Sequence, residues 1–289
     1  SSNRYGIITM TKTVFITGSS SGFGQATVEL FARSGWNVAC TMRAHHMDRD
    51  MFAAHSNVKV YELEVTDYAQ TISVAAQAIA DFGKIDVVVN NAGYCLMGPT
   101  ETSTMEQIEH QFETNVFGLL AVTKAFIPHF RKNMDGIFIN LASASAQFNY
   151  PYIAAYGGSK WAVRGITESL GIELAPFNIV VKAVYPGLHA TRIFTKLVDG
   201  TDSSGAAYLF YKNNYDIFNS AQVSVDEVTA PSNIANEIFK AASTKGGKLH
   251  IVSGGDAKLY RFLKTILSAR MFQKLQIRSI SQTMSKGEI

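Results

Sequence analysis

Short apolar runs alternate with longer segments of helical periodicity along most of the chain. Strands buried on both faces of a sheet lose their polar positions, so such runs predict a parallel sheet. Seven of them stand at residues 13–17, 37–42, 58–65, 86–92, 136–143, 179–186 and 248–254. Helical patterns lie between them. One ends at Ala32, one covers about 68–82, one runs from Ser103 or Thr104 to about Phe130, and the last two cover about 152–174 and about 231–243. This alternation predicts an α/β fold, a three-layer Rossmann-like doubly wound sheet of about seven parallel strands.

One long irregular section, at about 188–224, interrupts this rhythm. It is rich in aromatic residues, namely Phe194, Tyr208, Phe210, Tyr211, Tyr215 and Phe218. A loop of this length in a compact domain is usually functional, and its aromatic content predicts a lid over an apolar substrate or a small core of its own. We expect a single catalytic domain over 10–256, an expression remnant at 1–9 ahead of Met10, and a basic helical extension over 257–289.

Composition narrows the classes of function. The chain has 289 residues, 47% hydrophobic and 17% charged, which suits one large α/β domain. The formal net charge is +3, and residues 257–289 carry seven Lys or Arg and one Glu, so the rest of the chain is near −3. This distribution argues against a nucleic-acid binder. The two cysteines, Cys40 and Cys95, indicate a cytoplasmic protein without a disulfide framework. No histidine spacing suits a metal site, and no Gly-x-Ser-x-Gly hydrolase elbow occurs.

A glycine-rich loop, TGSSSGFG at 17–24, joins the first strand to the first helix. Gly18 permits the tight turn, Gly22 lets the backbone approach a pyrophosphate, and Gly24 lets helix and sheet pack closely. Phosphates are expected at the positive end of the helix. The backbone N–H groups predicted to face them belong to Ser19, Ser21, Gly22 and Phe23.

The end of the second strand bears on the choice of nucleotide. It reads Thr41-Met42-Arg43, without the carboxylate that holds the ribose of NAD. Arg43 can pair with a phosphate through two hydrogen bonds. We therefore predict that NADP(H) is preferred over NAD(H), although a solvated surface role for Arg43 is the alternative.

The stretch YGGSK at 156–160 places a phenol and an ammonium on one face of a helix. A phenol of pKa about 10 is too basic to cycle near neutral pH, and a nearby cation lowers that pKa. Tyr156 and Lys160 can form such a pair, and Ser143 at the end of the adjacent strand can donate to the same substrate oxygen. Two glycines cost a helix about 2 kcal/mol relative to alanine, so we expect the neighbouring helix, or the same helix of a second subunit, to pack closely against Gly157 and Gly158.

Six motifs occur in order: TGSSSGFG, NNAG at 90–93, Asn115, Ser143, YGGSK and PGLHAT at 186–191. With them the chain resembles the short-chain dehydrogenase/reductase family over about residues 11–255, and is similar to NADP-linked carbonyl, retinol and steroid reductases. The resemblance implies hydride transfer between a nicotinamide and a carbonyl or alcohol carbon, and a homodimer or homotetramer. A cofactor-binding regulatory protein without turnover is the alternative, and the intact Ser143, Tyr156 and Lys160 argue against it.

The resemblance also assigns roles by position. Tyr156 is the general acid/base, Lys160 lowers its pKa and binds the nicotinamide ribose, Ser143 holds the substrate oxygen, and Asn115 supports a proton-relay water. Asn91, Ala92 and Gly93 lie beside the adenosine. Glu64 and Val65 stand where the family more often has Asp-Val beside the adenine, and Ala142 where it often has a second serine. Pro186, Gly187 and Thr191 hold the nicotinamide end.

Substrate contacts are predicted by position at Tyr94, Phe148, Tyr150 and His189, while Cys95 is expected to pack near the cleft. In the C-terminal extension the apolar residues Leu259, Phe262, Leu263, Ile266 and Leu267 share a helical face opposite Lys258, Arg261 and Lys264. Such a helix can lie on a membrane. Arg270 falls on the apolar side and weakens the pattern, so we expect the extension to pack on the body or on a second subunit instead.

Overall fold

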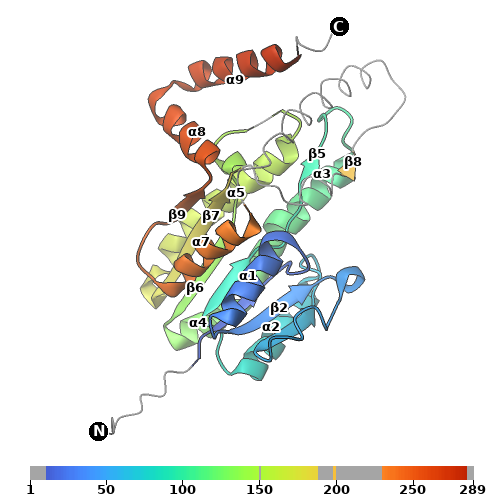
Figure 1. Cartoon of the computed structure of the whole chain (residues 1–289), viewed down its shortest axis with the longest axis vertical. Coiled ribbons are helices and arrows are strands. Elements are labelled where there is room, and N and C mark those ends of the chain that lie inside the picture. Colours follow the sequence, from blue (N-terminus) through green and yellow to red (C-terminus); the bar gives the residue numbers. More distant parts are fainter. Residues whose placement is uncertain (1–10, 150, 188–197, 200–229, 285–289) are drawn as a thin grey trace.

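The computed structural model describes residues 11–149, 151–187, 198–199 and 230–284 (Figure 1). Seven strands form one parallel sheet in the order β3-β2-β1-β4-β6-β7-β9. Their bounds are β1 Thr13–Ile16, β2 Asn37–Met42, β3 Val58–Glu62, β4 Val87–Asn90, β6 Gly136–Leu141, β7 Ile179–Pro186 and β9 His250–Ser253. The doubly wound sheet and each of its predicted strands are confirmed, with most strands ending a residue or more inside the predicted bounds.

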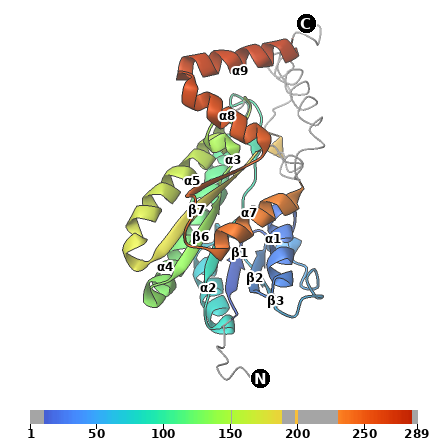
Figure 2. The ribbon, with the colours of Figure 1, turned by 60° about the vertical axis from the view of Figure 1, so that its left-hand side comes forward.

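Two helical layers cover the sheet (Figure 2). On one face α1 (Gly22–Arg33) packs against α7 (Pro231–Ser243), and on the other lie α2 (Tyr68–Phe82), α4 (Leu119–Asn133) and α5 (Ala154–Glu173). Successive side chains of a strand point to opposite faces. Val14 and Ile16 accordingly join the core under α1 and α7, while Phe15 joins the core under α2 and α4. Both faces are buried, which explains the apolar runs in the sequence.

The predicted helix from 103 or 104 to about 130 is interrupted. It begins at α3 (Met105–Phe112), whose N-cap is Thr104 in a reciprocal capping box with Gln107. A π-helical turn over Glu113–Gly118 then leads into α4. A Cβ on Gly118 would lie 2.7 Å from Val65 Cγ2, so the absence of a side chain lets this turn pack closely against the segment that follows β3. Such π-turns often mark functional sites because they re-aim a side chain.

A second, two-stranded sheet was not predicted. It pairs β5 (Leu96–Met97) with β8 (Val198–Asp199). Two-residue strands leave no periodic pattern in a sequence, so their detection requires the tertiary pairing. Apart from β8, the predicted lid at 188–224 lies outside the described residues.

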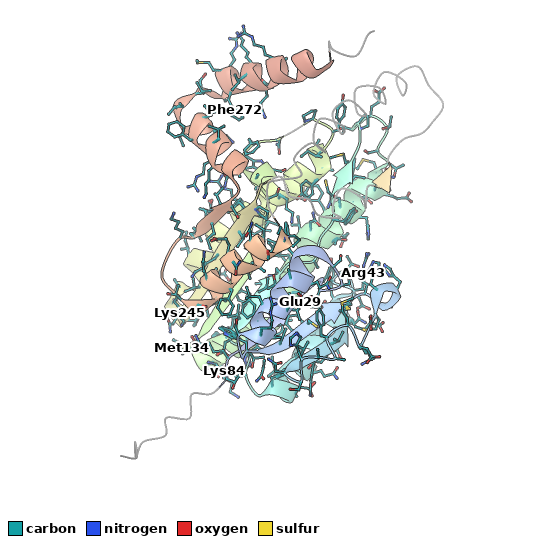
Figure 3. The ribbon with its side chains drawn as sticks, viewed as in Figure 1. Glu29, Arg43, Lys84, Met134, Lys245 and Phe272 are labelled. Atoms are coloured by element: carbon teal, nitrogen blue, oxygen red, sulfur yellow. The ribbon has the colours of Figure 1, made fainter. Side chains whose placement is uncertain are left out.

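The two ends of the sheet differ in character (Figure 3). Near its amino end Lys84 and Lys245 both pair with Asp135, at 2.8 and 2.6 Å. At the opposite end the chain leaves β9 into α8 (Gly255–Ile266) and α9 (Ala269–Met284), which realise the predicted helical extension. Among the described residues, no helix combines the length and apolar character needed to cross a bilayer.

Candidate functional site

The glycine-rich loop has the close approaches predicted for it. A Cβ on Gly18, whose φ is 68°, would lie 2.8 Å from Ala92 Cα, and a Cβ on Gly24 would lie 2.3 Å from the carbonyl oxygen of Gly18. The loop is therefore packed tightly against the end of β4 and the start of α1. Gly22 differs, because its Cβ position, at a φ of 61°, has nothing within 4 Å. Its open backbone beside the N-terminus of α1 leaves room for a phosphate group.

A cavity of about 440 Å³ opens beside this loop. Predicted cofactor residues line it, namely Gly18, Ser21, Gly22, Phe23, Arg43, Glu64, Val65, Asn91, Ala92 and Gly93. They come from the ends of β1, β2 and β4 and from the segment after β3, so the carboxyl edge of the sheet brings them together (Figure 3 labels Arg43). Ligands bind at this edge of doubly wound sheets, where the strand order reverses. Here that reversal lies between β1 and β4.

Ser19 corrects one prediction. Its side chain is fully buried, its backbone N–H donates to the Thr41 carbonyl at 2.9 Å and its hydroxyl donates to the Ile16 carbonyl at 3.2 Å. The N–H of Ser19 therefore joins β1 to β2 instead of facing phosphates. Ser20, the next residue, lines the cavity. Gly24, also a predicted cofactor residue, packs against the backbone of Gly18 and is not among the residues that line the cavity.

His46 is a cavity residue that the sequence pattern did not indicate. It lies in a 3-10 turn, Ala44–His46, directly after Arg43. The Arg43 Nη2 and His46 Nε2 atoms are 3.4 Å apart, and both side chains line the cavity. The His45 ring lies 4.1 Å from the His46 ring. The signal available in the sequence was the His45-His46 pair close after an arginine that was already a candidate.

Ser143, Tyr156 and Lys160 meet beyond the cavity. Tyr156 and Lys160 are 8% and 6% exposed and lie four residues apart in the first turns of α5. The Lys160 ammonium is 5.8 Å from the centre of the Tyr156 ring and donates to the Leu141 carbonyl at 2.7 Å. Ser143 directly follows β6, in extended conformation, before a 3-10 turn. A Cβ on Gly93 would lie 3.7 Å from Lys160 Nζ, so this cluster adjoins the cavity.

Burial governs the pKa values of this cluster. Burial raises the pKa of the Tyr156 phenol, Cys95 raises it further, and the hydroxyl of Ser143 lowers it by hydrogen bonding. Burial lowers the pKa of the Lys160 ammonium from 10.5 to about 8. The pKa of Tyr156 is thus raised, contrary to the expectation, and Lys160 is not among the groups that shift it. The raised pKa makes the Tyr156 phenol a weaker acid than a phenol in water.

Asn115 occupies the π-turn and is 2% exposed. Its Nδ2 donates to the Tyr94 carbonyl at 3.0 Å and to Ser159 Oγ at 3.2 Å, and its Oδ1 accepts from the Tyr94 N–H at 3.1 Å. The Ser159 hydroxyl donates in turn to the Tyr156 carbonyl at 2.6 Å. The Asn115 amide therefore ties the segment after β4 to the helix that carries Tyr156.

The paired glycines of α5 have their close neighbours within the chain. A Cβ on Gly157 would lie 2.3 Å from Asn149 Oδ1, so the bare backbone admits the loop that follows Ser143. A Cβ on Gly158 would meet only the Phe112 ring of α3, at 3.5 Å. At Gly157 the close neighbour is a loop side chain, not the neighbouring helix or the second subunit that was expected. At Gly158 the neighbouring helix is within ordinary contact distance.

The remaining predicted residues lie in different places. Pro186 is buried at the end of β7, and the Gly187 N–H donates to the Ser253 carbonyl at 2.8 Å. Cys95 is 1% exposed, with a pKa that burial raises to about 12, whereas Tyr94 lines the cavity. Phe148 packs with Ala144, Ala257 and Phe272 in a buried cluster. Tyr150, His189 and Thr191 lie outside the described residues.

Known proteins resemble this chain over most of its length. A family model described as short chain dehydrogenase matches residues 12–202. The uncharacterized oxidoreductase YusZ of Bacillus subtilis is 34% identical over 80% of this chain and 85% of its own length. A short-chain dehydrogenase from Streptomyces avermitilis superposes with a TM-score of 0.77 at 31% identity, covering 94% of this chain and 98% of that one. ElxO with NADP bound has a TM-score of 0.70 at 27% identity, covering 84% and 97%.

Proposed function

The chain belongs to the short-chain dehydrogenase/reductase family of oxidoreductases, and from that premise we propose that it reduces a hydrophobic carbonyl compound with NADPH, reversibly as an alcohol dehydrogenase. The observation that carries this proposal is the cluster of Ser143, Tyr156 and Lys160 beside a cavity whose glycine-rich wall suits a dinucleotide. The open space at Gly22 and the close approaches of Gly18 and Gly24 meet the requirements of a bound pyrophosphate. The cofactor supplies the hydride when it is bound.

Preference for NADP(H) is supported by the far end of the cavity. Arg43 offers a planar cation that can form two hydrogen bonds to a phosphate, and His46 Nε2, 3.4 Å from Arg43 Nη2, can accept from the guanidinium and orient it. ElxO, whose fold is similar, binds NADP. We assign the pair to the phosphate on the adenosine ribose.

The site residues divide the work of proton transfer. The Tyr156 phenol donates a proton to the carbonyl oxygen as negative charge develops there, and Ser143 donates a hydrogen bond to the same oxygen. Below its pKa of about 8, Lys160 carries a positive charge. This charge stabilises the phenolate that Tyr156 becomes after it gives up its proton. Asn115 holds the helix of Tyr156 against the segment after β4.

Replacing Tyr156 with phenylalanine tests this mechanism. Tyr156→Phe should bind NADPH as tightly as the natural protein and lose turnover by about a thousandfold or more, because it removes the donated proton and leaves the ring. Tyr61→Phe is the matched control: it also removes the phenolic hydroxyl of a buried tyrosine, one that donates to Asp81 at 2.7 Å and belongs to a residue that does not line the cavity. A panel of apolar ketones and aldehydes, followed by loss of nicotinamide absorbance, supplies the assay. Full turnover in Tyr156→Phe would contradict the assignment.

A further inference from the structure

Helix α8 presents its apolar face to solvent. Leu259, Phe262 and Ile266 are 56%, 60% and 60% exposed. Their spacing of three and four residues places them in one stripe along the helix. A stripe of this kind normally faces the core of a protein, so its outward position needs an explanation.

The opposite side of α8 attaches the helix to the body. Ala257 is fully buried, and Leu263 and Leu267 pack against the cluster that holds Phe148. The Lys264 ammonium donates to the Gln147 carbonyl and lies 4.4 Å from the centre of the Trp161 ring. A lysine thus occupies the side of the helix that faces the protein, while three large apolar residues occupy the side that does not. The expectation that the cations lie opposite the body is wrong for Lys264.

Exposed cations are frequent on the two C-terminal helices. Residues 257–284 include six Lys or Arg and no Asp or Glu. Lys258 on α8 and Arg270, Lys274 and Arg278 on α9 are all exposed. Helix α9 adds further exposed apolar side chains, Met271, Leu275 and Ile277. Apolar side chains among cations match an anionic bilayer surface, where the former enter the interface and the latter meet lipid phosphates.

The helix pair also packs against the loop that follows Ser143. Phe272 of α9 is 5% exposed and packs against Phe148, five residues after Ser143 (Figure 3 labels Phe272). Gln276 Nε2 donates to the Asn149 carbonyl at 2.8 Å. A surface that binds α8 would therefore lie close to the loop that follows Ser143, on the carboxyl side of the sheet (Figure 1).

We propose that the α8 stripe of Leu259, Phe262 and Ile266, with the cations around it, binds the protein peripherally to anionic lipid bilayers. The stripe enters the interfacial region, and α8 stays parallel to the surface. A second copy of the chain is a poorer occupant, because it would bring one cationic rim against another. Because α8 lies next to the loop that follows Ser143, a bound bilayer would bring apolar substrates close to the candidate site.

Vesicle co-sedimentation of the full chain tests the proposal without reference to activity. At low salt the protein should bind vesicles of phosphatidylcholine with about 30 mol% phosphatidylglycerol and bind pure phosphatidylcholine at least about tenfold more weakly. Raising NaCl to about 1 M should release it, since charges are then screened beyond about 3 Å. Equal sedimentation with both vesicle types, or with neither, would overturn the proposal.

Matched variants locate the surface. Ile266→Ser should weaken vesicle binding about fivefold, and the triple Leu259→Ser, Phe262→Ser, Ile266→Ser variant more than about tenfold. The control is Ile72→Ser, which removes an isoleucine that is 65% exposed on α2. Equal losses for Ile72→Ser and Ile266→Ser would contradict the assignment.

A charge variant and a measurement of mass complete the test. Lys258→Glu with Lys274→Glu leaves the apolar stripe intact, so its loss of binding to anionic vesicles would support the proposal even if the triple variant failed to fold. Light scattering of the lipid-free protein tests a second copy as occupant. If Ile266→Ser dissociated an oligomer and left vesicle binding unchanged, the stripe would be a subunit interface and the proposal would be wrong.

Discussion

Arg43 offers the sharpest test of cofactor choice. If its guanidinium holds the phosphate on the adenosine ribose, Arg43→Ala should weaken the binding of NADPH. The binding of NADH should not change, because NADH lacks that phosphate. The side chain lines the cavity and is partly exposed, with Nη2 3.4 Å from His46 Nε2. Loss of the fold is not expected, because Arg43 lies after the last residue of β2.

The size of the effect follows from this exposure. A charge-assisted hydrogen bond contributes about 1.5–3 kcal/mol, and solvent screening at a partly exposed site favours the lower end. The dissociation constant for NADPH should therefore rise about tenfold, at 1.4 kcal/mol for each factor of ten. His46→Asn should raise it by a smaller factor, since the arginine still faces the phosphate. For NADH both variants should stay within about twofold of the natural protein.

Calorimetric or fluorescence titration with each nucleotide measures these constants and needs no knowledge of the substrate. Arg33→Ala is the matched control, because Arg33 is an exposed arginine in the last turn of α1 and does not line the cavity. Higher salt should weaken the binding of NADPH more than the binding of NADH in the natural protein. Equal weakening of both nucleotides by Arg43→Ala would refute the reasoning, because the arginine would then act on a part that they share.

Two further predictions concern the glycine loop and the buried lysine. Gly18→Ala should weaken NADPH binding by more than about tenfold and lower the melting temperature, because its Cβ would meet Ala92 Cα at 2.8 Å with φ at 68°; unchanged titration and melting curves would contradict this. The Lys160 pKa is about 8 in the folded chain against 10.5 as its ordinary value, so the unfolded chain holds more protons between these pH values and the free energy of unfolding should rise with pH there. Urea unfolding at several pH values should show that Lys160→Met makes this rise smaller, and an unchanged slope would refute the prediction.

The fold could be predicted almost entirely from the sequence. Seven apolar runs marked seven strands because a parallel sheet covered on both faces leaves few polar positions in its strands. Thr104 was a recognisable helix start, since its hydroxyl and Gln107 satisfy each other's backbone N–H groups. The π-turn after Phe112 was not predicted, because it alters the helical spacing over only a few residues between two segments of α-helix.

The site divides in a similar way. Local spacing placed Tyr156 and Lys160 on one helix face and Gly18 in a tight turn, because 3.6 residues per turn and a positive φ are properties of short segments. Ser19 and His46 required the tertiary structure. Whether an N–H faces a phosphate or a neighbouring strand depends on which residues lie across from it, and the sequence of the loop does not predict those residues.

The sequence by itself therefore determined the family, the sheet and the chemistry available at Ser143, Tyr156 and Lys160, since motif order and periodicity are local. Only the tertiary structure decided how strongly those groups are buried, and with it the direction in which the pKa values of Tyr156 and Lys160 shift. It also decided which side of α8 faces the protein. Periodicity shows that a helix has an apolar face, but the tertiary contacts show that this face is divided: Leu263 and Leu267 pack on the body, and Leu259, Phe262 and Ile266 are exposed.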